Sequence, residues 1–111
     1  MIIKYGTHKL ALTCDKNKVK QIVNALVSQF DDTFTFTQLS AAVLLKAEEE
    51  NLLKKEPNTQ YVGQIELSFY DLDLINLIVW EMIWEKEVVI VLYKNPYRPI
   101  NEGNFLFKKV N

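Results

Sequence analysis

One run of the chain places its apolar and polar positions with a clear helical period. Its apolar positions follow the spacing i, i+3, i+4, i+7, i+8 and i+11, at Val19, Ile22, Val23, Leu26, Val27 and Phe30. This spacing puts all of them on one face of a helix. Asp15 stands just before the run, where its carboxylate can accept a free N–H of the first turn. The pattern predicts an amphipathic helix from about Lys16 to Gln29.

A second helix is predicted after a short extended link at Thr33-Phe34. Thr35 and Gln38 have the spacing of a capping box, in which each side chain accepts a backbone N–H of the other residue. Phe34 and Leu39 flank this box at the positions of a hydrophobic staple. The helix is expected to run from Phe36 to about Lys54, and its apolar positions predict burial of Leu39, Ala42, Val43 and Leu45. Three consecutive glutamates at 48–50 oppose the helix dipole and favour an early end.

The third predicted helix is apolar around most of its circumference. Ser68 or Asp71 can cap its start. Its apolar residues are Leu72, Leu74, Ile75, Leu77, Ile78, Val79, Met82 and Ile83. Because they cover more than one face, we expect the helix to be largely buried.

Strands are predicted on both sides of this helix and at the start of the chain. Residues 88–93 form an unbroken, β-branched run, which is typical of a strand covered on both faces or of a central strand. Two prolines and a glycine predict a loop over residues 94–104, and alternating phenylalanines predict a return strand after it. Residues 61–67 alternate like a short strand. Gly6-Thr7 separates two apolar stretches, which indicates an N-terminal hairpin or a strand arm.

The order of these elements resembles the winged-helix fold. The residues that carry the resemblance are the stripe from Val19 to Phe30, the helix start FTFTQLSAAV, the helix LINLIVWEMI, and VVIVLYKNPYRPINEGNFLFKKV as strand, wing and strand. The resemblance covers roughly residues 15 to 110. It departs from the family over residues 51–67, where a tight turn would be usual, and in the extra N-terminal segment. It implies an α+β, three-helix winged-helix-like domain with a small antiparallel sheet.

The resemblance also implies a role for the third helix in DNA binding. In that family this helix usually enters the major groove with Arg, Lys, Asn or Gln at base edges. Here it carries several carboxylates, which phosphates repel, and no arginine. The wing offers better contacts, because Lys94, Tyr97 and Arg98 could reach phosphates or a minor groove. Lys108 adds a cation in the return strand.

Composition fits a folded, single-domain protein spanning residues 1–111. The chain is 49% apolar and 24% charged, which argues against disorder. Acidic residues interrupt every long apolar stretch, so we expect neither a membrane span nor a membrane partner. The N-terminal segment lacks the apolar run of a signal peptide. Cys14 is the single cysteine, which suits a reducing cytoplasm.

Charge is distributed unevenly along the chain. Residues 48–87 hold ten acidic residues against three lysines, whereas the rest of the chain carries a net charge of +6. If the two basic termini met in space they would form a basic face opposite an acidic one. A mixed, solvated surface is the other interpretation, and it is the one we favour.

Candidate chemistry is sparse. His8 and Cys14 lie near each other in sequence, but a nucleophile and base pair needs an orienting group that neither has nearby. A surface histidine and a packed cysteine are the simpler interpretation. Neither a metal-ligand cluster nor a glycine-rich phosphate loop stands out. We therefore expect no enzyme, no cofactor and no metal site.

Trp80 and Trp84 carry the remaining functional signal. Four residues apart on a helix, they share one face with Leu77, and Glu81 lies at its border. Burial in the core is the interpretation that aromatic size favours. The alternative is an exposed strip that binds a protein partner or a second copy of the chain. We predict a non-catalytic regulatory or interaction module, homodimeric through this helix, and the alternative is a DNA-binding regulator that uses the basic termini and the wing.

Overall fold

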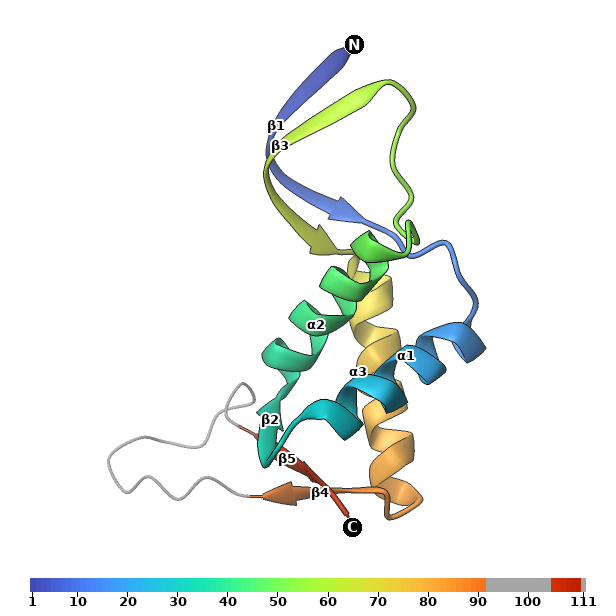
Figure 1. The fold of residues 1–111 in the computed structure, drawn as a ribbon, viewed down its shortest axis with the longest axis vertical. Coiled ribbons are helices and arrows are strands. Elements are labelled where there is room, and N and C mark those ends of the chain that lie inside the picture. The colour runs from blue at the N-terminus through green and yellow to red at the C-terminus, as the bar shows by residue number, and fades with distance from the viewer. Residues whose placement is uncertain (92–104, 111) are drawn as a thin grey trace, which may run out of the picture.

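Three helices and two separate sheets make up the fold of this computed structural model, which describes residues 1–91 and 105–110 (Figure 1). The fold class is α+β. In chain order the elements are β1 (Ile2–Leu10), α1 (Lys16–Gln29), β2 (Thr33–Thr35), α2 (Phe36–Glu49), β3 (Thr59–Leu67), α3 (Phe69–Trp84), β4 (Val88–Val91) and β5 (Leu106–Lys109).

The first helix begins and ends where its periodicity predicts. The Asp15 carboxylate caps α1 by accepting the Lys18 N–H at 2.9 Å. The residues of α1 that are buried are Val19, Ile22, Val23 and Val27, which are four members of the predicted stripe. The periodic pattern and the cap together account for this helix.

The second helix begins with the predicted capping box and ends earlier than Lys54. The Gln38 side chain accepts the Thr35 backbone N–H at 2.9 Å, and the Thr35 hydroxyl accepts the Gln38 backbone N–H at 3.1 Å. The helix ends at Glu49, and Asn51 follows with a positive φ of 55°. The expected burial of Leu45 is wrong, because its side chain is 61% exposed and Ala47 is buried in its place.

A three-stranded antiparallel sheet of order β2-β5-β4 closes one end of the helical body. The rings of Phe34 and Phe107 meet across β2 and β5 with centroids 5.6 Å apart. Burial of β4 on both faces is wrong, because Val88 is buried and Val89 is 43% exposed. The sheet therefore covers the core with one face only. A central position for β4 is also wrong, because β5 is the central strand and β4 lies at the edge. The predicted loop at 94–104 lies outside the described residues.

The other sheet is a parallel pair, β1 with β3, that projects from the opposite end of the body (Figure 1). The predicted N-terminal hairpin is wrong, since β1 continues through Gly6 as one strand and forms the strand arm. Gly6 and Gly63 lie opposite each other with φ of 109° and 114°. A Cβ on Gly63 would lie 2.2 Å from the Gly6 carbonyl oxygen. The glycines therefore permit a close strand contact and do not form a turn.

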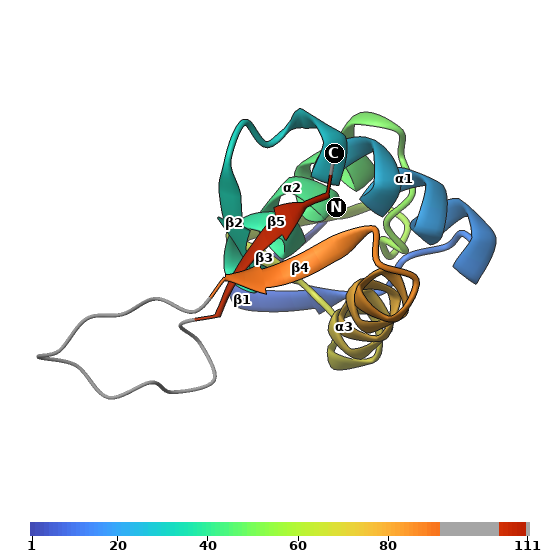
Figure 2. The ribbon, with the colours of Figure 1, turned by 90° about the horizontal axis from the view of Figure 1, so that it is seen from below.

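The helices bury the core between them. Seen from below, α3 runs nearly along the line of sight at the rim of the body, with α1 and α2 on its inner side (Figure 2). The side chains that fill the core are mostly branched aliphatic ones, among them Val19, Val23, Leu39, Val43, Ile75 and Ile78. This arrangement leaves the outer side of α3 without a described element over it.

Candidate protein-interaction surface

The start of α3 is held in place by a small polar cluster. Ser68 caps the helix, and its hydroxyl also donates to the Asp71 carboxylate. The same carboxylate accepts the backbone N–H of Leu12 at 3.0 Å. Asp71 is buried, and these two donors supply the hydrogen bonds that a buried carboxylate needs. The cluster fixes α3 relative to the chain segment that follows β1.

The inner face of α3 supplies the core contacts of this helix. Its buried apolar residues are Ile75, Ile78, Val79 and Met82. They lie within about 100° of the helix circumference, given 3.6 residues per turn. The remaining apolar positions of α3 therefore cannot all be buried in the same core.

A second set of large apolar side chains points to solvent from the outer side of α3. We call this set the α3 face, and it consists of Phe69, Tyr70, Leu77, Trp80 and Trp84. Their positions fall within about 100° of one another on the helix. Burial of the tryptophans in the core is wrong, because Trp80 is 49% and Trp84 is 88% exposed. The smaller aliphatic residues fill the core, and the aromatic residues remain outside.

The predicted interface residues have different environments in the structure. Leu77, Trp80 and Trp84 belong to the α3 face. Glu81 lies beside it and turns toward α1, where its two carboxylate oxygens lie 3.0 and 3.3 Å from the Nζ atoms of Lys16 and Lys20. Hydrogen bonds from these two lysines hold the pKa of Glu81 below its usual value. Glu81 therefore joins α1 to α3.

The residues predicted for nucleic-acid contact do not form a described site. Lys94, Tyr97 and Arg98 lie outside the described residues. Lys108 lies in β5, with its Nζ atom 3.5 Å from the Asp32 carboxylate. Lys108 is therefore the one member of the predicted set that the structure describes, and the predicted site is not seen in the described part of the chain.

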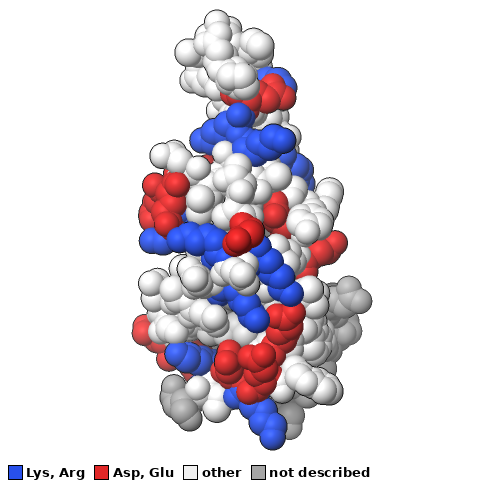
Figure 3. All heavy atoms as spheres, turned by 90° about the vertical axis from the view of Figure 1, so that its right-hand side faces the viewer, with Lys and Arg blue, Asp and Glu red and all other residues white. Residues whose placement is uncertain are grey.

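The two basic ends of the chain do not form one face. The strands β1 and β5 lie at opposite ends of the molecule (Figure 1). The N-terminal lysines instead lie close to acids of the 48–87 stretch, in the ion pairs Lys4–Glu56, Lys9–Glu66, Lys16–Glu81, Lys18–Glu50 and Lys20–Glu81. Figure 3 shows the two signs of charge interleaved over the side of the molecule that it presents. Among the described residues the alternative of one basic face is wrong, and the favoured mixed surface is found.

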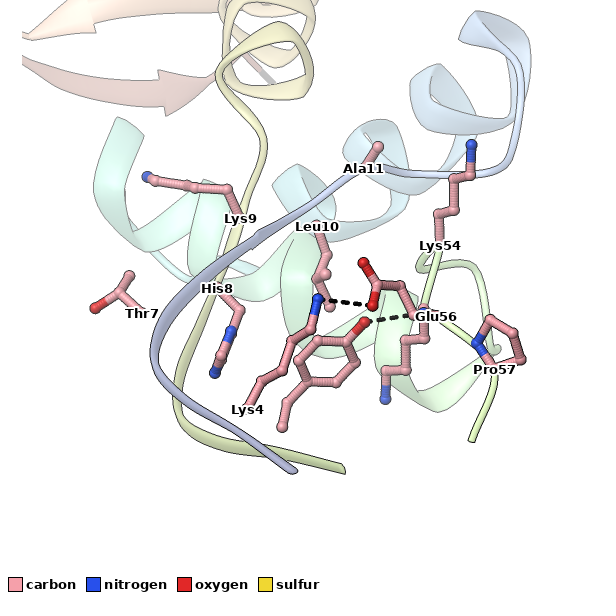
Figure 4. A pocket seen from close by; sticks show the side chains of 11 residues that line it. Lys4, Thr7, His8, Lys9, Leu10, Ala11, Lys54, Glu56 and Pro57 are labelled. Carbon is pink, nitrogen blue, oxygen red and sulfur yellow. Dashed lines mark hydrogen bonds and ion pairs between the residues drawn. The ribbon is translucent and has the colours of Figure 1, made fainter. Parts of the chain in front are cut away.

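The strand arm curves around a hollow of about 570 Å³ (Figure 4). Lys4 and Glu56 meet across it at 2.7 Å, and this contact raises the pKa of Lys4. His8 lies in the same hollow, with Nε2 3.2 Å from the Val62 carbonyl oxygen. Its ring also meets the ring of Tyr61 edge-on. These contacts account for the single histidine as part of the arm.

Cys14 has the surroundings of a packed thiol. It is half-buried against the core, and this burial raises the pKa of the thiol. A raised pKa disfavours the thiolate that a nucleophile or metal ligand requires. Within the described part of the chain, no three His, Cys, Asp or Glu side chains gather closely enough to hold a metal ion.

Comparison with known proteins finds no match: no family model fits the chain, and no curated protein or solved structure is significantly similar to it. The described helices include none that is long and apolar enough to cross a membrane.

Sequence reasoning found three residues of the α3 face and missed two. Phe69 and Tyr70 come directly after the Ser68 cap, at 0° and 100° on a helical projection that places Trp84 at about 60°. This projection, applied from the cap onward, would have added both residues to the tryptophan strip.

Proposed function

We propose that this protein is a non-catalytic interaction module that forms a homodimer through the α3 face. The observation that carries the proposal is the exposure of five large apolar side chains on one side of one helix. Exposed apolar side chains are common singly, but a contiguous group of them marks a contact surface. Tryptophan and tyrosine are also the residues that contribute most at protein interfaces.

The size of the α3 face suits a dimer contact. A fully exposed aromatic side chain presents about 150–250 Å² of surface. At their exposed fractions, the four aromatic residues of the face present roughly 400–700 Å² together. A standard interface covers about 800 Å² on each partner, so the face with its border residues approaches that area.

Charge favours an antiparallel arrangement of the two helices. Asp73 is exposed among the residues of the α3 face and is the acid nearest its middle. A parallel pair would place Asp73 beside the same residue of the partner, and the like charges would repel. An antiparallel pair centred on Leu77 separates the two aspartates by roughly 12 Å along the axis and brings Trp84 to Phe69 and Tyr70 of the partner. Asp73 then lies level with Glu81 of the partner, whose charge is offset by its ion pairs with lysines of α1.

The element order supports a winged-helix-like body with additions. The sequence α1, β2, α2, α3, β4, β5 and the sheet order β2-β5-β4 fit that arrangement, with β1 and β3 as additional strands. On this proposal the third helix, which reads DNA in winged-helix regulators, presents aromatic and acidic residues that suit protein. The paired N-terminal lysines likewise favour a protein partner over nucleic acid.

The test is sedimentation equilibrium of the wild type and Trp84→Ala over a range of protein concentrations. The wild type should dimerise, and Trp84→Ala should raise the dimer dissociation constant at least tenfold, as expected for loss of a large, exposed aromatic contact. Leu45→Ala is the matched control, because Leu45 is an exposed apolar residue on α2. Circular dichroism checks that both variants fold.

Two results would count against the proposal. One is a wild type that stays monomeric at all concentrations. The other is equal weakening by Trp84→Ala and Leu45→Ala. A monomer that instead binds duplex DNA with a steep salt dependence would support the regulator that uses the wing.

A further inference from the structure

The strand arm, β1 with β3, is an unusual structure for a pair of strands standing alone. Parallel strands normally lie inside sheets that are covered on both faces. A two-stranded ribbon is at best marginally stable in water. Both strands of the arm have nine residues, and the two-stranded sheet has no third strand among the described residues. Such a ribbon is more stable when another strand extends it.

The backbone hydrogen bonds show which groups of β1 are available. Ile2 N–H donates to the Asn58 carbonyl at one end, and the Leu10 carbonyl accepts from Ser68 N–H at the other. Even-numbered residues of β1 therefore turn their backbone groups toward β3. Residues 3, 5 and 7 turn theirs to the outer edge, where no backbone partner is present in the described structure.

This outer edge is closed farther along the chain. The Ala11 carbonyl accepts the Lys54 N–H at 2.8 Å, and the Thr13 N–H donates to the Leu52 carbonyl at 2.7 Å. The chain then leaves this edge and crosses to the start of β3 over the face that carries Lys4 and Glu56 (Figure 4). The open edge therefore spans residues 3–7, at the outer end of the arm.

The side chains near this open edge are apolar and uncharged. Ile3 and Tyr5 are 49% and 76% exposed, and Val62 lies beside Tyr5 in the strand register. The one charge in this part of β1 belongs to Lys4, which is paired with Glu56. A two-fold contact places each residue against its own copy or a near neighbour, so a charged edge would repel itself. This edge does not.

We propose that the outer edge of β1 pairs antiparallel with the same edge of a second copy. With the two-fold axis at Tyr5, this residue faces Tyr5 of the partner and Ile3 faces Thr7. All three residues turn N–H and C=O outward, so these pairs form about six hydrogen bonds. The product is a four-stranded sheet of order β3-β1-β1-β3, in which each parallel pair gains an inner neighbour.

The outer edge of β3 is a poorer site for the same contact. Its lower half lies against α2, where Gln64, Glu66 and Leu67 line a hollow together with Ser40 and Leu44 of the helix. A strand added there would meet α2 before it completed its hydrogen bonds. At Ile3 and Tyr5 the β1 edge has no such neighbour, and only its Thr7 end lines a hollow, together with residues 54–57.

This contact is separate from the α3 face, and it rests on different residues. A chain with two different two-fold contacts forms assemblies larger than a dimer. We therefore expect the wild type to exceed the dimer at high concentration. Loss of either contact should stop the assembly at a dimer, and loss of both should leave a monomer.

Tyr5→Pro tests the edge contact directly. Proline removes the outward N–H of residue 5 but none of the hydrogen bonds to β3, and it is tolerated on an open edge. Tyr5→Val is the matched control, because it keeps the N–H of residue 5, and its β-branched side chain also favours a strand. In sedimentation equilibrium Tyr5→Pro should stop at the α3 dimer, Tyr5→Val should assemble further, and Tyr5→Pro with Trp84→Ala should be monomeric.

Disulfide cross-linking gives a second test of the edge contact, in a variant that keeps all backbone N–H groups of β1. Tyr5→Cys, made with Cys14→Ser, should form an intermolecular disulfide under mild oxidation. The paired Cα atoms would lie about 5.5 Å apart, which a disulfide can span. Val62→Cys, also made with Cys14→Ser, is the control on β3, the outer strand of the proposed sheet, and should not cross-link.

The outcomes separate this inference from the proposed function. If Tyr5→Pro assembles like the wild type, or Tyr5→Cys stays uncrosslinked, the edge contact is wrong. A Trp84→Ala variant that is fully monomeric also overturns the edge contact, and this result supports the proposed dimer through the α3 face. A Tyr5→Pro variant that is monomeric, with Trp84→Ala unchanged, supports the edge contact and overturns the α3 dimer.

Discussion

Helices α1 and α3 are of similar length and pack against each other, yet their solvent sides differ in character. The outer side of α1 is polar, with lysines that pair to acids of neighbouring elements. The outer side of α3 is aromatic and aliphatic. A helix that contacts only its own core has polar residues elsewhere, as α1 does. The second apolar face of α3 is the basis of the proposed dimer contact, because no described element of the chain covers it.

The largest expected effect contrasts the two faces of α3. Ile78→Ala on the inner face should lower the free energy of unfolding by about 2–5 kcal/mol, because it leaves a cavity in the core. Leu77→Ala on the outer face should change it by about 0.5 kcal/mol or less in the monomer. Urea unfolding at low protein concentration measures both.

The same pair of variants should behave in the opposite way in self-association. Leu77→Ala should weaken the dimer at a concentration where Ile78→Ala, if still folded, does not. Equal losses of folding stability from the two variants would show that the outer face of α3 is part of the core after all.

A single period in the sequence predicts burial well, and a mixed pattern does not. The stripe of α1 has one helical period, so its buried residues follow from spacing alone. In α3 apolar residues occupy most positions, so spacing cannot tell which of them meet the core. The choice depends on the shapes of the facing helices, and here the branched side chains Ile75, Ile78 and Val79 are the ones that fit.

The strand arm shows a different limit. Its two strands are paired in parallel across more than fifty residues, and nothing local in β1 points to β3. Gly6 gave the signal of a turn, because glycine is common in turns. Here the same freedom at positive φ serves a close contact with Gly63. Local signals predicted both strands, but their partner is a matter of tertiary structure.

The carboxylates at the starts of α3 and α1 offer the next contrast. Asp71→Ala removes a buried acceptor and leaves the Leu12 N–H and the Ser68 hydroxyl without their partner, at about 1–3 kcal/mol for each buried group. Asp15→Ala at the start of α1 removes one exposed cap, at about 1 kcal/mol. Chemical denaturation should therefore rank Asp71→Ala as the more destabilising. The reverse order would mean that the polar cluster below the arm contributes little to stability.

The smallest expected effect concerns the ion pairs that join the two helices. Because Lys16 and Lys20 lower the pKa of Glu81 in the folded state, the contribution of Glu81 to stability is present above the ordinary carboxyl pKa of about 4.5. It is lost as the pH falls through the lower folded-state value. Glu81→Gln should thus be slightly less stable than the wild type at pH 7.

The difference should shrink at pH 3, below the ordinary carboxyl pKa, because the wild-type carboxyl group takes up a proton as the pH falls. Urea unfolding at the two pH values measures it. Glu85→Gln is the control, because this residue at the C-terminal end of α3 has no ion pair among the described residues, and removing its charge there favours the helix dipole. A Glu81→Gln deficit that is equal at both pH values would assign the effect to packing. In that case the ion pairs of Glu81 with the two lysines of α1 would not stabilise the contact between α1 and α3.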